Sequence, residues 1–109
     1  TRWLILADDL TGAADSAIPF ARRGLDSVVS WSPAAAGAPR TAIVSHNTDS
    51  RGLTAGAAAD GSTMRSTHSE PGRDLFKKID STLRGQPAAE IAATMAHMKR
   101  RFGRVFCLL

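Results

Sequence analysis

Three short segments of this sequence concentrate side chains that can accept protons, bind anions and hydrogen-bond to hydroxyl groups. They read ADDLTGAAD (residues 7–15), NTDSRG (47–52) and KKIDSTLRG (77–85). A carboxylate accepts hydrogen bonds from hydroxyl groups and can take a proton from one of them. Arginine binds a carboxylate through two parallel donors. Together, these groups match a small ligand that carries several hydroxyl groups and an acid group.

The adjacent carboxylates Asp8 and Asp9 directly follow the apolar run WLILA (3–7). Two like charges at the end of a buried segment repel each other and prefer water, so fold stability gives little reason for them. We therefore interpret the pair as functional. One of the two is expected to orient and deprotonate a ligand hydroxyl, and Asp80 is the next candidate for this role.

The three segments supply all the candidate site residues. The candidate catalytic residues are Asp9, Asp8 and Asp80. The candidate substrate-binding residues are Asp8, Asp9, Thr11, Asp15, Asn47, Asp49, Ser50, Arg51, Lys78, Asp80, Ser81 and Arg84. No metal ligands are predicted, because the histidines are scattered and only His46 lies beside a polar segment.

Structural roles compete with ligand binding at several of these positions. Thr11, Ser50 and Thr82 are equally suited to cap a helix or turn. Asp15 could simply favour the positive end of a helix.

The basic candidates have alternatives of the same kind. Arg51 and Arg84 could pair with the aspartates instead of a ligand. Lys78 is preferred to Lys77 as the site lysine because it shares one face of a strand with Asp80.

Strands and helices alternate along the sequence and must position the three segments. Strands are predicted at 3–7, 27–31, 41–45, 75–79 and 104–109, and helices at 11–23, 54–65 and 87–102. Pro19 predicts a kink or an early break in the first helix, and loops are expected at 32–39 and 66–72. This alternation predicts an α/β fold: an open, mostly parallel, Rossmann-like sheet with helices on both faces. Each polar segment lies at the carboxyl end of a strand, the edge where such sheets bind ligands.

Composition bounds the class of protein. The 109 residues suffice for a single domain, and the net charge is +4. The basic residues are scattered except for Lys99–Arg101 at a helix end, where they complement the helix dipole, so nucleic acid is not an expected partner. No apolar run is long enough to span a membrane. The sequence also lacks GxxxxGK[ST] and GxGxxG, so it is poorly suited to hold a polyphosphate by itself.

The C-terminal residues and the single cysteine carry two further expectations. Cys107 is the single cysteine, which excludes an internal disulfide. It lies in the apolar run VFCLL and is expected to be a buried small hydrophobe. With no signal-peptide pattern, the cytoplasm is the predicted compartment. A bare apolar strand at the end predicts that the chain is a fragment, the incomplete N-terminal part of a larger two-domain protein.

In this order, the three segments resemble the N-terminal domain of the four-carbon acid sugar kinases, which include kinases for threonate, erythronate and 3-oxo-tetronate. The resemblance covers nearly the whole chain, and KKIDSTLRG is its most specific part. It implies that this domain holds a sugar acid. It also implies that ATP with Mg²⁺ is bound mainly by a C-terminal domain absent from the chain, so the chain alone would be inactive.

The resemblance supports particular residues in each segment. They are Asp8, Asp9, Thr11, Gly12 and Asp15; Asn47, Asp49, Ser50 and Arg51; and Lys78, Asp80, Ser81, Thr82, Arg84 and Gly85. Many members carry Asn where this chain has Ala14, a departure that bears on substrate range.

The leading hypothesis is therefore ATP-dependent phosphorylation of a four-carbon sugar acid, with this part supplying the sugar-acid site. One alternative is a phosphorelay receiver, which also has paired acids after its first strand and a lysine after a later one. A second alternative is a sugar-acid binding domain without catalysis. The sequence leaves the oligomeric state open, a homo-oligomer included.

Overall fold

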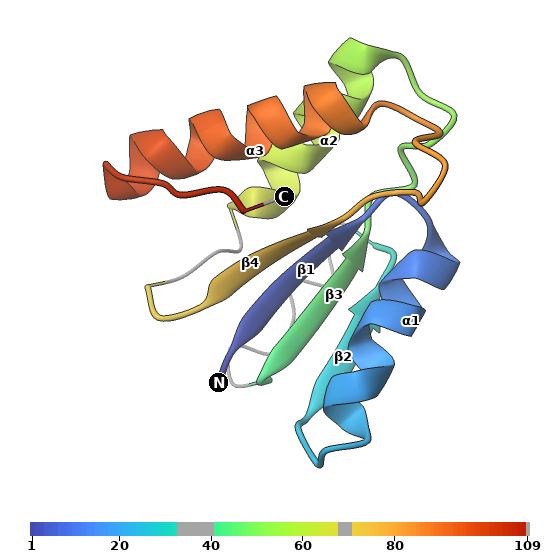
Figure 1. The fold of residues 1–109 in the computed structure, drawn as a ribbon, viewed down its shortest axis with the longest axis vertical. Coiled ribbons are helices and arrows are strands. Elements are labelled where there is room, and N and C mark those ends of the chain that lie inside the picture. The colour runs from blue at the N-terminus through green and yellow to red at the C-terminus, as the bar shows by residue number, and fades with distance from the viewer. Residues whose placement is uncertain (33–40, 68–70, 109) are drawn as a thin grey trace.

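The computed structural model describes residues 1–32, 41–67 and 71–108, and these form a four-stranded sheet. Its strands are β1 (Trp3–Ala7), β2 (Ser27–Ser30), β3 (Ile43–Asn47) and β4 (Asp74–Lys78). They pair in parallel in the order β2-β3-β1-β4 (Figure 1). The predicted parallel α/β sheet is confirmed.

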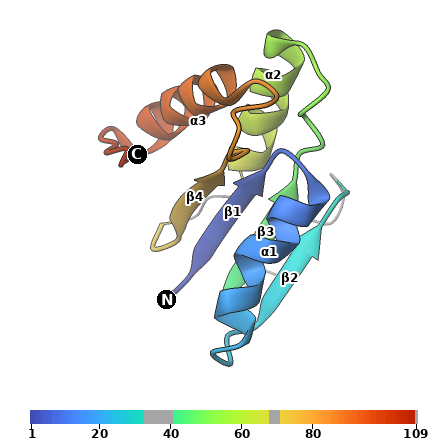
Figure 2. The same cartoon turned by 45° about the vertical axis from the view of Figure 1, so that its right-hand side comes forward.

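Helices lie on both sides of the sheet, as predicted. Helix α1 (Leu10–Ala21) packs on one face, and α2 (Ala55–Ser66) and α3 (Pro87–Phe102) lie on the other side (Figures 1 and 2). The apolar run of β1 explains this layering, because its side chains are buried in both directions. Leu4 and Leu6 pack with Val44 on one face, and Ile5 packs with Ala17 on the other.

Helix α1 begins at an aspartate cap and packs closely through small residues. The Asp9 side chain accepts a hydrogen bond from the Gly12 backbone, and Ala13 is fully buried. From β3, the buried Ser45 hydroxyl donates to the Ala13 carbonyl over 2.8 Å, which locks the helix to the sheet. The predicted early break at Pro19 is wrong: the helix runs on to Ala21, because proline in the last turn disturbs few hydrogen bonds.

Strand β3 is shifted by two residues from its predicted range of 41–45. It ends at Asn47, so His46 and Asn47 belong to the strand rather than to the loop. They pair with Leu6 and Ala7 of β1, and both are buried. The sequence pattern placed these two residues in a loop because they are polar. Backbone pairing with β1 extends the strand through them, since it does not depend on the type of side chain.

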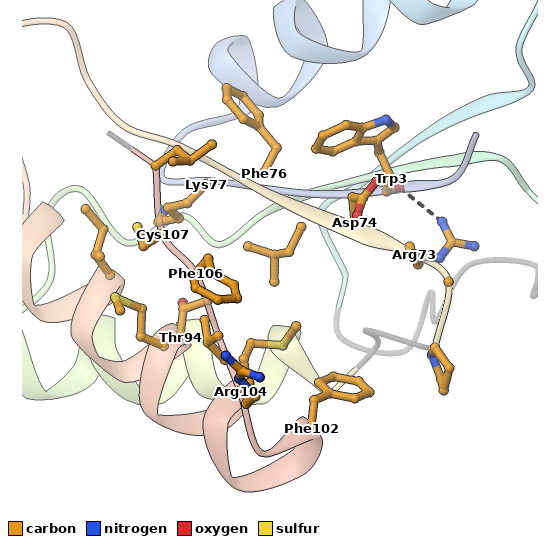
Figure 3. A pocket seen from close by; sticks show the side chains of 18 of the residues that line it. Trp3, Arg73, Asp74, Phe76, Lys77, Thr94, Phe102, Arg104, Phe106 and Cys107 are labelled. Carbon is orange, nitrogen blue, oxygen red and sulfur yellow. Dashed lines mark hydrogen bonds between the residues drawn. The ribbon is translucent and has the colours of Figure 1, made fainter.

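The predicted fifth strand is wrong for residues 104–108, which adopt no strand conformation. After α3, Gly103 takes a φ of 80° and turns the chain back, and the segment follows a largely apolar groove between α3 and β4 (Figure 3). A strand needs a paired neighbour, and this segment pairs with none of the four strands of the described sheet. Cys107 is consequently exposed, contrary to the expected burial.

Two predicted loops fall partly outside the described residues. The loop at 32–39 does so beyond Ser32, and the loop at 66–72 does so at residues 68–70. Within the described ranges, none of the helices has the length and apolar character needed to cross a membrane.

Candidate functional site

The connections that leave the neighbouring strands β1 and β3 run toward opposite edges of the sheet. From β1 it passes over one face through α1 to β2, and from β3 it passes over the other face through α2 to β4. The loops leaving the two strands therefore diverge at the carboxyl edge, the usual ligand position in such sheets. Asp8 and Asp9 follow β1 there, and Arg51 lies in the loop that follows β3.

The Arg51 guanidinium group joins the first and second polar segments. Its Nε lies 3.1 Å from Asp8 Oδ2, and its Nη2 lies 3.2 Å from Asp8 Oδ1, a two-donor pair. The same Nη2 lies 3.3 Å from Asp9 Oδ1 and 3.5 Å from Asp80 Oδ1. Hydrogen bonding to Asp8 raises the pKa of Arg51. One side chain thus meets carboxylates from two different strand ends.

The adjacent aspartates have different environments. Asp8 is almost fully buried, whereas the Asp9 side chain is 30% exposed and caps α1 through Oδ1. Adjacent residues on an extended segment point in opposite directions, but the turn into α1 lets both carboxylates approach Arg51. Asp9 is the more accessible carboxylate to a ligand.

The third polar segment folds around the carboxylate of Asp80. Asp80 accepts hydrogen bonds from the Thr82 hydroxyl, from the backbone of Thr82 and Arg84, and from the Arg84 guanidinium at 2.9 and 3.0 Å. These bonds, led by those from the Arg84 side chain, hold the pKa of Asp80 well below its usual range. The same contact raises the pKa of Arg84. Asp80 is thus an ionised acceptor that organises its own loop.

Two of the polar loops contain left-handed backbone at residues other than glycine. In the described chain these are Asp49, with φ 50°, and Leu83, with φ 60°. Such conformations cost about 1–3 kcal/mol and persist where the surrounding structure imposes them, often at ligand sites. Their location in the second and third segments is consistent with a site at this edge.

Gly85 allows the second and third segments to approach each other. It has a φ of +82°, and a Cβ atom built there would lie 3.2 Å from the Arg51 Cα and 3.3 Å from Asp8 Oδ2. A side chain at this position would push the Arg51 backbone away from Asp8. Glycine at this position thus provides both the left-handed backbone conformation and the space for close contact with the Arg51 backbone.

We expect Gly85→Ala to lower the free energy of unfolding more than Gly24→Ala. Gly24 has nearly the same φ, +81°, but open space around it. Both variants lose about 1–2 kcal/mol to left-handed strain, and Gly85→Ala loses roughly 1–3 kcal/mol more to the close contact with Arg51. Denaturant titration of both variants measures the difference, and equal losses would show that the Arg51 segment shifts freely.

The lowered pKa of Asp80 predicts an acid-sensitive contribution to stability. Its contribution is present above the unfolded pKa of about 3.9 and is lost as the pH falls through the lower folded pKa. The unfolding free energy of Asp80→Asn should therefore fall less steeply than that of the unsubstituted protein between about pH 5 and pH 2, where a carboxylate with a lowered pKa loses its contribution. Arg84→Ala removes the leading cause of the shift and should act in the same direction. An unchanged slope in Asp80→Asn would contradict this assignment.

The remaining residues of the second segment are held by the protein itself. The Ser50 hydroxyl is fully buried and lies 2.7 Å from Glu90 Oε1 and 2.7 Å from the Thr48 hydroxyl. Asn47 is buried, and its side chain accepts a hydrogen bond from the Asp49 backbone. Asp49 is exposed. Within this segment, Arg51 is the residue that the structure brings to the carboxylates of the first segment.

Several candidates are not joined to the Arg51 cluster by a hydrogen bond or ion pair among the described residues. Thr11 and Asp15 are exposed on α1, and Ser81 is exposed in the loop after β4. Lys78 passes beside Gly12 on the α1 side, and its Nζ donates to the Ile79 carbonyl. The assignment of these residues to a ligand stays a prediction.

Lys77 and Glu90 form a buried polar contact that the sequence interpretation missed. Lys77 Nζ lies 3.2 Å from Glu90 Oε1, on the sheet face opposite Lys78. Glu90 is an acidic residue in the first turn of α3, a position where such residues commonly favour the positive end of the helix, yet it is 1% exposed. Its place beside Ile91, on the edge of the apolar face of α3, was the available signal.

The described residues contain no group of three or more His, Cys, Asp or Glu side chains arranged to hold a metal ion. The Asp8 and Asp80 carboxylates are instead paired with arginines. The groove between α3 and β4 is a separate feature, because Leu75, Ile91 and Met98 line it and none of the three carboxylates does. Figure 3 shows its aromatic side chains Phe102 and Phe106.

The structure defines an α/β domain with a cluster of paired arginines and aspartates at the carboxyl edge of a parallel sheet. Residues 3–108 match the family described as the sugar-binding N-terminal domain. The chain belongs to this family and is an N-terminal domain of the four-carbon acid sugar kinase type. The predicted family resemblance is confirmed.

Three relatives are named D-threonate kinase. The protein from Cupriavidus necator is 47% identical over 84% of this chain, and the proteins from Salmonella typhimurium and Bordetella bronchiseptica are 31% and 37% identical over 92% and 82% of it. The aligned region is only 23–24% of each relative. The chain thus spans about a quarter of the length of these proteins.

Solved structures agree with the fold. Two crystal structures of a Bordetella bronchiseptica protein, described as a domain of unknown function with bound citrate and as a domain-swapped dimer, match with TM-scores of 0.77 and 0.78. Identity is 34% and 35%, and the matches cover 89% and 88% of this chain and 26% of theirs.

Proposed function

We propose that this chain supplies the sugar-acid site of an ATP-dependent kinase that phosphorylates a four-carbon acid such as threonate, erythronate or a 3-oxo-tetronate. The observation that carries the proposal is the position of Arg51 between Asp8, Asp9 and Asp80 at the carboxyl edge. Guanidinium and carboxylate groups from all three polar segments stand there within reach of one small polyhydroxy acid. The D-threonate kinase relatives support the same substrate class.

Each group has a role in this proposal. The Asp9 carboxylate, the more accessible of the pair, orients one ligand hydroxyl and takes its proton as that oxygen attacks the terminal phosphorus and ADP leaves. The contacts of Arg51 with the aspartates use Nε and Nη2, so we assign Nη1 to the ligand carboxylate. Asp8 holds Arg51 in this orientation. Citrate, described as bound in the related Bordetella structures, is likewise a hydroxy acid.

ATP and Mg²⁺ are proposed to bind outside the residues described. The polar edge carries three carboxylates against two arginines, both paired with aspartates. This charge balance repels the several negative charges of a polyphosphate far more strongly than the single charge of a sugar acid. The residues present therefore do not fit a nucleotide site, and a separate C-terminal nucleotide-binding domain stays a prediction. Assembly into a homo-oligomer and a cytoplasmic location are likewise proposals.

The receiver alternative is weakened by the site itself. A receiver needs its paired acids open to a divalent cation, whereas Arg51 occupies the space between Asp8 and Asp9. A binding domain without catalysis would keep the same geometry, so turnover must separate it from a kinase.

The decisive experiment is an ADP-release screen of the intact protein with threonate, erythronate and their oxo forms. We expect turnover with at least one of these acids. Controls without substrate and with citrate should show only background ADP release. Calorimetric binding of an acid without ADP release would favour the non-catalytic alternative. Neither binding nor turnover with any acid would overturn the proposal.

A further inference from the structure

Glu90 is a buried carboxylate on which three side-chain donors converge. The hydroxyls of Ser50 and Ser62 lie 2.7 Å and 3.1 Å from its Oε1, and Lys77 Nζ lies 3.2 Å from the same atom. Glu90 itself is 1% exposed, and both serines are fully buried.

The three donors come from three different elements. Ser50 lies in the loop after β3, Ser62 in α2 and Lys77 in β4, while Glu90 belongs to the first turn of α3. A buried ion pair contributes little net stability, because desolvation offsets much of its Coulomb energy. Stability alone therefore does not explain why this carboxylate lies at the junction of the two helices and the sheet.

The site loop offers the explanation. The Ser50 backbone N–H donates to the Asp8 carbonyl over 3.1 Å, and its side chain is held by Glu90. Ser50 is thus fixed on both sides, and the next residue is Arg51, whose guanidinium group meets the three site carboxylates. A long flexible side chain binds well only when its backbone is fixed, since small displacements of a binding group are costly.

We propose that Glu90 is a positioning residue that, through Ser50, fixes Arg51 for binding of the sugar acid. This inference rests on the proposed function. It also places Ser50 in support of Arg51 rather than in contact with substrate. Because Glu90 lies in the helix that follows the KKIDSTLRG loop, it links the second polar segment to the third.

The chain offers a matched pair of variants for the test. Ser50→Ala and Ser62→Ala each remove one buried hydroxyl donor from the same Oε1 atom, but only Ser50 adjoins Arg51. In the intact protein, Ser50→Ala and Glu90→Gln should raise the KM for the sugar acid about five- to tenfold, the equivalent of one buried hydrogen bond. Ser62→Ala should change it less than about twofold, and the KM for ATP should stay constant in all three.

A double-variant cycle separates positioning from direct contact. If Glu90 acts through Ser50, combining Ser50→Ala with Glu90→Gln should raise KM no further than either change alone. Additive effects would overturn the proposal, and so would equal effects of Ser50→Ala and Ser62→Ala. Should Glu90→Gln fail to fold, the comparison of the two serine variants decides.

A measurement without substrate distinguishes failure of this inference from failure of the proposed function. The NMR signal of the Arg51 Nε–H group, assigned by its loss in Arg51→Lys, reports the environment of the guanidinium group. It should shift in Ser50→Ala and remain in place in Ser62→Ala. An unmoved signal in Ser50→Ala would overturn the positioning role, whereas absent turnover in the wild-type protein would overturn the kinase assignment.

Discussion

Asp9→Asn is expected to lower kcat by roughly 10²–10⁴-fold, the usual contribution of a general base. The amide keeps the shape of the side chain and an oxygen that can accept a hydrogen bond, so the KM for the sugar acid should change much less. Asparagine caps helices about as well as aspartate, so α1 should keep its start at Leu10 and the melting temperature should hold. Steady-state kinetics and thermal unfolding of the intact variant test all three expectations.

Asp8→Asn is the matched control for this prediction. Asp8 is 3% exposed and makes the two-donor pair with Arg51, so loss of its charge removes the partner of a largely enclosed guanidinium group. Its melting temperature should fall further than that of Asp9→Asn, and kcat should fall less. A reversed order would make Asp8 the base, and full activity in both variants would show that the pair serves only the structure.

Arg51→Ala should raise the KM for the sugar acid on the order of 10²-fold, the scale expected when one partner of a desolvated charge pair is removed. The KM for ATP should change little, because the nucleotide is proposed to bind elsewhere. Arg51→Lys should recover only part of the loss, since an ammonium group cannot pair with Asp8 through two donors and still present a separate donor to the ligand. Kinetics with each substrate varied in turn provide the measurement.

Arg84→Ala serves as the comparison for Arg51. Its side chain is 65% exposed and pairs with Asp80 four residues earlier in the same loop, an arrangement that contributes little at a surface. The effect on sugar-acid KM should accordingly be several times smaller. If both arginine variants kept wild-type kinetics, both side chains would be structural partners of the aspartates, and the ligand would need another anchor.

The periodicity and side-chain chemistry of the sequence predicted the parallel sheet and the edge at which the polar segments meet. A run that is apolar on both faces, as at residues 3–7, can be buried only inside a sheet covered on both sides, and alternation with helices makes that sheet parallel. The carboxyl ends of parallel strands share one edge, so the three polar segments had to meet there. For this reason Asp8, Asp9, Arg51 and Asp80 could be grouped before any coordinates were known.

Pairing between segments distant in sequence could not be predicted in the same way. Sequence pattern did not indicate that Arg51 would pair with Asp8, which lies 43 residues away in the sequence, because that contact depends on how the two loops fold against one another. Nor did it reveal that Glu90, ordinary for a first helical turn, would be buried against Ser50 and Lys77.

The C-terminal segment is a second case in which the sequence pattern did not predict the tertiary structure. The apolar run at 104–109 has the composition of a strand, but strand formation requires a partner for its backbone, and the turn at Gly103 carries residues 104–108 over the groove beside α3 instead. The sequence alone determined the layers, the edge and the residue types at that edge, because these follow from local periodicity and side-chain chemistry. The tertiary structure decided which charges pair, which acid is buried and where the chain turns away from the sheet, because these depend on contacts between elements that local sequence does not encode.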